Sequence, residues 1–296
     1  MHILLAVDGS SGALNAVHTV RARFGAGTRI TLLHVLSRYT PSRSPLPDTL
    51  LGALRDEEDS SAHTILSETR ALLEGNGFEL TDHIAEGHPA QEITRVASEL
   101  KTDLIMMGAL GLTGWMRALL GSISLTVVKH APCPVWVVKH PPETRPLQLL
   151  LATDGSPDAR HALLFLGDLP FAADAHLNLL HVVPSINEQL QLSGGPLDPP
   201  VLTPLYELGD HFHLRGKHLL KEDMETASKR FAQVHTATAE GDPRRHILDH
   251  AKTMEADLIV MGSKGLSGIR EFFLGSVSHN VLKHAHTSVM IVMAEE

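Results

Sequence analysis

The chain contains the same glycine-spaced stretch twice, and this duplication limits the possible folds more than any other feature. Each copy has two glycines three positions apart, nine further residues and a closing Gly-Ser pair. The copies run Gly108-Ala-Leu-Gly111 to Gly121-Ser122 and Gly262-Ser-Lys-Gly265 to Gly275-Ser276. Residues 103–138 align with residues 257–292 without a gap, and 18 of the 36 aligned positions are identical. The sequence therefore predicts two related halves.

The residues around each copy indicate a phosphate-binding loop. An apolar run typical of a buried strand precedes the glycines, at 104–107 and 258–261, and a helix-like segment follows the Gly-Ser pair. Glycine permits positive φ and lets a ligand approach the backbone. The first amides of a helix lack intrahelical partners and favour an anion, so this order of elements forms a phosphate cradle. The alternative is that the glycines only permit tight turns, and the repeated spacing argues against it.

Strand-like and helix-like segments alternate along both halves. In the first half we expect strands at 2–7, 29–35, 78–85, 103–107 and 134–138, and helices at 11–24, 49–73, 89–100 and 122–130. The second half repeats this order. The alternation favours an α/β fold with a parallel, doubly wound sheet, in which ligands bind beyond the carboxyl ends of the strands. We expect domains at 1–139 and 148–296, joined by a proline-rich linker at 140–147.

The glycine pattern resembles the ATP-binding signature of the universal stress protein family. The openings Leu5–Ser10 and Leu151–Ser156 and the runs 32–35 and 179–182 resemble that family's first turn and second strand. The resemblance implies two tandem Rossmann-like domains of the adenine nucleotide alpha hydrolase-like type. Each would hold a five-stranded parallel sheet of order 3-2-1-4-5 with helices on both faces. Strands one and four would then be adjacent, and the aspartate of each first turn would face the glycine loop.

The resemblance also implies the residues that bind the nucleotide. Asp8 and Asp154 match an aspartate near the ribose and adenine, and the backbone at Val35 and Val182 matches an adenine contact. The positions expected in the first half are Ala6, Asp8, Val35, Gly108, Leu110, Gly111, Gly114, Gly121, Ser122 and Ser124. Those expected in the second half are Ala152, Asp154, Val182, Gly262, Lys264, Gly265, Gly268, Gly275, Ser276 and Ser278. The implied ligand is ATP, ADP or AMP, accompanied by Mg²⁺. Ser122 and Ser276 would either cap their helices or turn toward phosphate.

The two halves differ inside the loop. The pair Ala109-Leu110 stands where the second half has Ser263-Lys264, and only a lysine can reach a phosphate as a point charge. We expect both halves to bind nucleotide, the second with more phosphate contacts. The second half also has extra residues in the proline-rich segment 184–204. This segment is interpreted as a surface loop, with a lid over the second site as the alternative.

Rival sites and partners are disfavoured by pattern and charge. No Gly-Lys-Ser/Thr follows a glycine loop, and Gly108, Gly111 and Gly114 do not match G-x-G-x-x-G. The formal charge of −9 disfavours binding to nucleic acid or an anionic membrane. The paired histidines His246 and His250 are interpreted as a solvated helix face, with a metal site as the alternative.

Other single features indicate structural roles. His34 and His181, repeated inside apolar strands, are expected to be core residues with satisfied hydrogen bonds, and Cys133 is expected to pack, not to act in redox chemistry. We find no signal-peptide or membrane-span pattern, so the cytoplasm is the expected compartment.

The sequence therefore predicts an ATP-binding sensor or regulator whose nucleotide occupancy alters its shape or partners. A weak ATPase or an enzyme that phosphorylates itself at Ser122 or Ser276 is one alternative, and a scaffold without nucleotide is another. The halves are expected to pair as an intramolecular pseudo-dimer through the strands at 135–138 and 289–292, with a homodimer of the whole chain as a further assembly to test.

Overall fold

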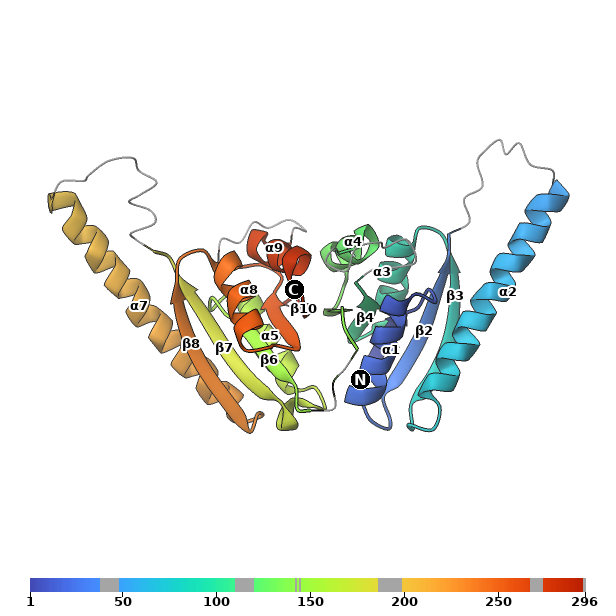
Figure 1. Cartoon of the computed structure of the whole chain (residues 1–296), viewed down its shortest axis with the longest axis horizontal. Coiled ribbons are helices and arrows are strands. Elements are labelled where there is room, and N and C mark those ends of the chain that lie inside the picture. Colours follow the sequence, from blue (N-terminus) through green and yellow to red (C-terminus); the bar gives the residue numbers. More distant parts are fainter. Residues whose placement is uncertain are drawn as a thin grey trace. The chain divides into compact units, whose positions relative to one another are not determined.

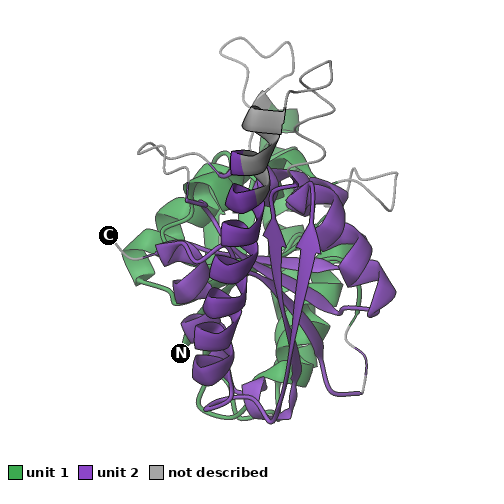
Figure 2. Cartoon of the chain, turned by 90° about the vertical axis from the view of Figure 1, so that its left-hand side faces the viewer, with its two compact units in different colours: residues 1–142 green, residues 143–296 purple. Residues whose placement is uncertain are grey.

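The computed structural model describes residues 1–37, 48–109, 120–141, 143, 145–185, 199–266 and 274–294. It divides into two compact units, residues 1–142 and 143–296, which Figure 2 shows in different colours. The division lies inside the proline-rich segment 140–147. Figure 1 shows that each unit contains the same kinds of element in the same order.

The first unit is a five-stranded parallel sheet with helices between its strands. Its elements are β1 (His2–Ala6), α1 (Ser11–Arg23), β2 (Arg29–Leu36), α2 (Asp48–Leu73), β3 (Glu79–Glu86), α3 (Pro89–Leu100), β4 (Leu104–Gly108), α4 (Ser122–His130) and β5 (Val135–Val138). The strand order is β3-β2-β1-β4-β5, and the paired strands run parallel. The predicted order 3-2-1-4-5 is therefore confirmed.

The second unit repeats this architecture. Its elements are β6 (Gln148–Ala152), α5 (Pro157–Gly167), the short 3₁₀ helix η1 (Ala172–Asp174), β7 (His176–Val183), α7 (Pro199–Ala227), β8 (Gln233–Glu240), α8 (Pro243–Thr253), β9 (Leu258–Gly262), α9 (Ser276–His284) and β10 (Ser288–Val292). The order β8-β7-β6-β9-β10 is that of the first unit, again with parallel pairs.

The central strands are the core of each unit. Ile3, Leu4 and Leu5 of β1 and the corresponding residues of β6 have no exposed side-chain surface. Continuous apolar runs are required here because helices cover both faces of the sheet. In the first unit α1 and α2 pack together over one face, while α3 and α4 pack together over the other (Figure 1).

A serine caps the helix that follows the first turn of each unit. The side chains of Ser10 and Ser156 accept hydrogen bonds from the backbone amides of Ala13 and Ala159, both at 3.2 Å, and so cap α1 and α5. The glycine before each cap, at positions 9 and 155, has φ near +77° and cannot be replaced without strain.

The expected loop at 184–204 is wrong for its last residues. Helix α7 begins at Pro199 and contains Pro204, whereas residues 186–198 lie outside the described part of the chain. The first amides of a helix have no intrahelical acceptor, so the prolines at positions 199 and 200 remove no hydrogen bond, whereas Pro204 lies inside the helix and removes one. The prediction from proline content therefore extended the loop past Pro199, where α7 begins.

Gly108 and Gly262, the last residues of β4 and β9, permit a close contact between helix and strand. An ideal Cβ on Gly108 would lie 2.4 Å from the carbonyl carbon of Gly12, and one on Gly262 would lie 2.8 Å from the amide nitrogen of Ala159. Both neighbours are backbone atoms in the first turn of a helix. Packing alone therefore requires these two glycines, which the sequence analysis had linked to phosphate binding.

Cys133 is buried between the end of α4 and the start of β5, where its thiol sulfur lies 3.6 Å from the hydroxyl oxygen of Thr102. Burial raises the pKa of Cys133 to about 11 because the thiolate would lose its hydration. The thiol is therefore neutral at physiological pH, which agrees with the packing role predicted from the sequence.

We predict that Gly108→Ala destabilises the chain, by roughly 1–3 kcal/mol, because the new methyl group overlaps the backbone of α1. The matched control is Gly25→Ala, since a Cβ at Gly25 meets no atom within 4 Å. Urea unfolding of both variants measures the difference. Equal midpoints for the two variants would contradict the packing role of Gly108.

We further predict that Cys133 resists Ellman's reagent in the folded protein at pH 8 and releases one thiol per chain in denaturant. Because the folded pKa lies above the unfolded one, the contribution of the thiol to stability is complete below about pH 9 and is lost as the pH rises toward 11. Unfolding curves between pH 8 and 11 should therefore show a steeper loss of stability for the wild type than for Cys133→Ala. Rapid labelling of the folded protein would refute the burial.

Candidate functional site

In each unit the carboxyl ends of the two central strands lie together at one edge of the sheet, and we name this edge the crevice. β1 is adjacent to β4 in the first unit and β6 is adjacent to β9 in the second, so the first turn of each unit lies beside its glycine loop. In an open parallel sheet this is the place where strand order reverses and ligands bind. The candidate sites are these two crevices.

The two ends of each glycine loop are joined by a hydrogen bond. The loop begins with an amide that donates to the adjacent strand end, Ala109 to Val138 at 2.9 Å and Ser263 to Val292 at 2.8 Å. The carbonyl oxygen of the same residue then accepts from the Gly-Ser pair, from the amide of Gly121 at 2.8 Å in the first unit and of Gly275 at 2.7 Å in the second. The loop therefore returns to its starting point, and the next helix begins there.

The glycine of each Gly-Ser pair, not the serine, is the N-cap of the following helix. Gly121 and Gly275 have extended ψ angles near 150°, and neither N-cap has a side chain that could accept from the amides of its helix. Ser122 and Ser276 are the first helical residues, and both are exposed. The amides at the start of α4 and α9 therefore point out of the helix at the crevice, where they would favour an anion.

Two serines predicted to bind the ligand, Ser124 and Ser278, are buried and have hydrogen-bond partners within the fold. Ser124 donates its hydroxyl hydrogen to the carbonyl oxygen of Gly108 at 3.0 Å, and Ser278 donates to that of Gly262 at 2.8 Å. Both are at most 5 % exposed. These hydroxyls fix the start of each helix against the end of the neighbouring strand.

In the second unit the aspartate of the first turn contacts the glycine loop. One carboxylate oxygen of Asp154 accepts from the amide of Ser156 at 2.9 Å, and the other accepts from the amide of Leu266 at 3.0 Å. A Cβ on Gly265 would lie 2.7 Å from the second oxygen, so Gly265 lets the carboxylate approach the loop. Asp154 thus joins the two segments that surround the crevice.

A second carboxylate, which the sequence analysis did not identify, also holds this loop. Asp158 lies in the first turn of α5, and one of its oxygens accepts from the hydroxyl of Ser263 at 2.6 Å and from the amide of Lys264 at 2.9 Å. Ser156 adds a bond from its hydroxyl to the carbonyl oxygen of Lys264 at 3.2 Å. A comparison of the two first turns could have revealed Asp158, because Gly12 occupies the equivalent position in the first unit.

The first crevice is described less completely. Asp8 accepts from the amide of Ser10 at 3.0 Å, as Asp154 does from Ser156. The remaining loop residues of the candidate set lie outside the described part of the chain: Leu110, Gly111, Gly114 and, in the second unit, Gly268.

The second strand of each unit extends beyond the first, which exposes backbone at the proposed adenine contact. The last residue of β1, Ala6, pairs with Leu33, whereas β2 continues to Leu36. Val35 therefore lies past the end of β1. Ala152, Leu180 and Val182 repeat this arrangement in the second unit.

The repeated histidines have hydrogen-bond partners within the fold, as expected. The Nδ1 atoms of His34 and His181 lie 2.9 Å and 2.8 Å from the carbonyl oxygens of Val7 and Thr153. Each histidine therefore ties the second strand to the residue that follows the first strand.

A buried carboxylate supports the first turn of the second unit only. Asp223 of α7 is 5 % exposed and accepts from the hydroxyl of Thr153 at 2.9 Å. Burial raises the pKa of Asp223, because the charged form loses hydration, although the bond from Thr153 opposes this shift. The equivalent residues of the first unit are Val7 and Thr69.

The metal hypothesis gains no support from the described residues, among which no group of three or more His, Cys, Asp or Glu side chains converges. Near His246 and His250, Asp249 forms an exposed ion pair with Arg245 at 3.4 Å. This pair is consistent with a solvated helix face. None of the described helices is long and apolar enough to span a bilayer.

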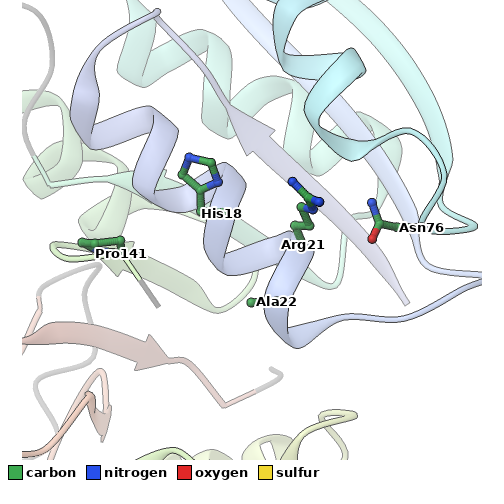
Figure 3. A pocket seen from close by; sticks show the side chains of 5 residues that line it. All are labelled: His18, Arg21, Ala22, Asn76 and Pro141. Atoms are coloured by element: carbon green, nitrogen blue, oxygen red, sulfur yellow. The ribbon is translucent and has the colours of Figure 1, made fainter. Parts of the chain in front are cut away.

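A shallow hollow on the first unit lies away from the crevice. It is lined by His18, Arg21, Ala22, Asn76 and Pro141, as Figure 3 shows. Arg21 belongs to the last turn of α1, whereas the crevice adjoins the first turn. The hollow is therefore separate from the candidate nucleotide site.

Comparison with known proteins gives one family for both units. The model of the family described as "Universal stress protein family" matches residues 1–139 and 148–293. A universal stress protein of Bacillus subtilis is 34 % identical over 148 residues, which cover 49 % of this chain and 97 % of the relative. One from Mycolicibacterium smegmatis is 28 % identical over 300 residues, covering 98 % of this chain and 96 % of the relative. The crystal structure of a universal stress protein from Archaeoglobus fulgidus has the same fold, with a TM-score of 0.69 and 22 % identity over 99 % of this chain and 98 % of that one.

We predict that Asp223→Asn changes the pH dependence of stability. A raised carboxyl pKa contributes stability that is present below the unfolded pKa near 4 and lost as the pH rises through the folded value. The amide removes this loss and can still accept from Thr153. The variant should therefore gain stability relative to wild type between pH 4 and pH 7. Parallel stability curves for the two proteins over this range would contradict a raised pKa.

Proposed function

The chain belongs to the universal stress protein family, and from that premise we propose that each of its two units binds an adenine nucleotide in the crevice at the carboxyl edge of its sheet. In this proposal, nucleotide occupancy regulates the shape of the chain or its choice of partner.

The observation that carries the proposal is the placement of two helix N-termini. α4 and α9 both begin at a glycine cap beside the end of the central strand, with an exposed serine as the first helical residue. Uncapped amides and the positive end of the helix dipole at such a place favour a phosphate group. The same arrangement occurs in both units, which supports two sites.

The other candidate residues suit the remaining parts of a nucleotide. The exposed backbone beyond β1 and β6, at Val35 and Val182, would take the adenine edge, and Asp8 and Asp154 would take the ribose hydroxyls. Lys264 would add a positive charge near the phosphates of the second site. Mg²⁺ bound with ATP keeps mostly water and phosphate oxygens as ligands, so it requires no cage of protein side chains.

Occupancy would alter the second loop through Asp154. This carboxylate now accepts from the amide of Leu266. A ribose hydroxyl that donates to Asp154 would compete with that amide for the carboxylate. Once the amide is released, the side chain of Leu266, which is 61 % exposed, would be free to move. Binding in the crevice would thereby change a surface that a partner can contact.

We predict that the purified chain releases about two adenine nucleotides per chain when it is denatured and its supernatant is chromatographed. Ser276→Glu should reduce the released nucleotide by about one per chain, because a carboxylate at the first helical position repels the phosphate group. The same carboxylate interacts favourably with the helix dipole, so the fold is preserved. Ser122→Glu should remove the other nucleotide. Ser60→Glu, an exposed position within α2, is the matched control for charge.

If the wild type or a variant loses its nucleotide during purification, calorimetry with ATP, ADP and AMP measures how many sites it has. Two binding events in the wild type, and one in each of the two crevice variants, would support the proposal. Absence of binding by the wild type, or equal binding by wild type and both crevice variants, would refute it.

A further inference from the structure

The two crevices have the same backbone hydrogen bonds at the ends of their glycine loops, and one hydrogen-bonded pair of side chains is among the features that differ between them. Asp158 and Ser263 form a 2.6 Å hydrogen bond in the second unit, and Gly12 and Ala109 occupy these positions in the first. Glycine and alanine have no polar side-chain atom, so the first unit lacks this bond.

The equivalence of the positions rests on contacts as well as on alignment. A Cβ on Gly108 would meet the carbonyl carbon of Gly12 at 2.4 Å, and a Cβ on Gly262 would meet that of Asp158 at 2.8 Å. The two residues therefore occupy the same place in the first turn of α1 and α5.

Ala109 and Ser263 are equivalent in the same sense. Each donates its amide to the last residue of the adjacent strand, and each accepts from the glycine that caps the following helix. Both partners of the Asp158–Ser263 pair are thus replaced together in the first unit, although the surrounding backbone contacts are kept.

Asp158 brings a negative charge to a loop proposed to bind phosphate. Its carboxylate takes the amide hydrogen of Lys264, a donor that a phosphate oxygen would otherwise use. It also offsets the positive end of α5, in whose first turn it lies. The negative charge of Asp154 does not distinguish the two units, because Asp8 carries the same charge at the equivalent position of the first unit.

Repulsion by a fixed carboxylate increases with the charge of the ligand. Without divalent cations ATP carries about two more negative charges than AMP, so a carboxylate in contact with a loop that binds the phosphates would penalise ATP more. A change that only loosens the loop would lower the affinities for ATP and AMP to a similar extent. The ratio of the two affinities therefore separates charge from structure.

We propose that Asp158 is a specificity-determining residue that makes the second site favour a nucleotide with a short phosphate chain, whereas the first site accepts a long one. This inference rests on the proposed function, because it assigns a ligand preference to the same crevice. It reverses the expectation that the lysine of the second loop gives that site the stronger hold on phosphates.

The test measures ATP and AMP binding by calorimetry in EDTA at one site at a time. The Ser122→Glu background leaves the second site, and the Ser276→Glu background leaves the first. We expect the ratio of dissociation constants, ATP over AMP, to be about tenfold higher at the second site, and Asp158→Asn to remove most of this difference. Asp174→Asn, an exposed carboxylate at the opposite edge of the sheet, is the matched control and should leave the ratio unchanged.

The reverse exchange provides an independent test if the Asp158 variant does not fold. Gly12→Asp combined with Ala109→Ser builds the pair into the first site and should raise its ratio by a similar factor. Equal ratios at the two sites, or an Asp158→Asn variant that weakens ATP and AMP alike, would overturn the inference and leave the proposed function intact. Failure of both backgrounds and of the wild type to bind either nucleotide would instead refute the proposed function itself.

Discussion

The contact on which both crevices depend is the approach of a helix backbone to the end of a neighbouring strand. In the first unit Gly108 lies against Gly12, and in the second Gly262 lies against Asp158 and Ala159. Any side chain at these glycines would push the helix off the sheet. The first turn and the glycine loop would then separate, and the bonds from Asp154 and Asp158 to the loop would be lost. A packing constraint therefore sets the geometry of the proposed binding site.

The same contact gives the glycines that follow the fourth strand of each unit a structural explanation. Glycines after a strand are commonly explained by the close approach of a ligand. At Gly108 and Gly262 a protein backbone makes the close approach, and at Gly265 the carboxylate of Asp154 does so. A bound phosphate would accept from the amides of the helix that follows the loop. The glycines permit the close contacts that hold the loop against the first turn.

Much of the fold could be predicted because its signals are local. Continuous apolar runs predicted the buried strands, and the duplication predicted the second unit. The roles of Ser124 and Ser278 could not be obtained in this way, because helix register decides whether a hydroxyl faces the ligand or the strand end. Asp158 was missed for a related reason. Its partners lie more than 100 residues away, and an acidic residue in a first helical turn is already explained by the helix dipole.

The hydrogen bond that joins the two ends of each glycine loop makes the loop a closed insert in an otherwise fixed scaffold. The amides of Gly121 and Gly275 bond to the residues where their loops begin, so the helix starts at the same place regardless of what the intervening chain contains. The two units keep this arrangement although the residues between the two anchor points differ. Duplication followed by divergence at and beside these anchor points, as at Ser263 and Asp158, would allow one chain to acquire two different ligand preferences without redesigning its core.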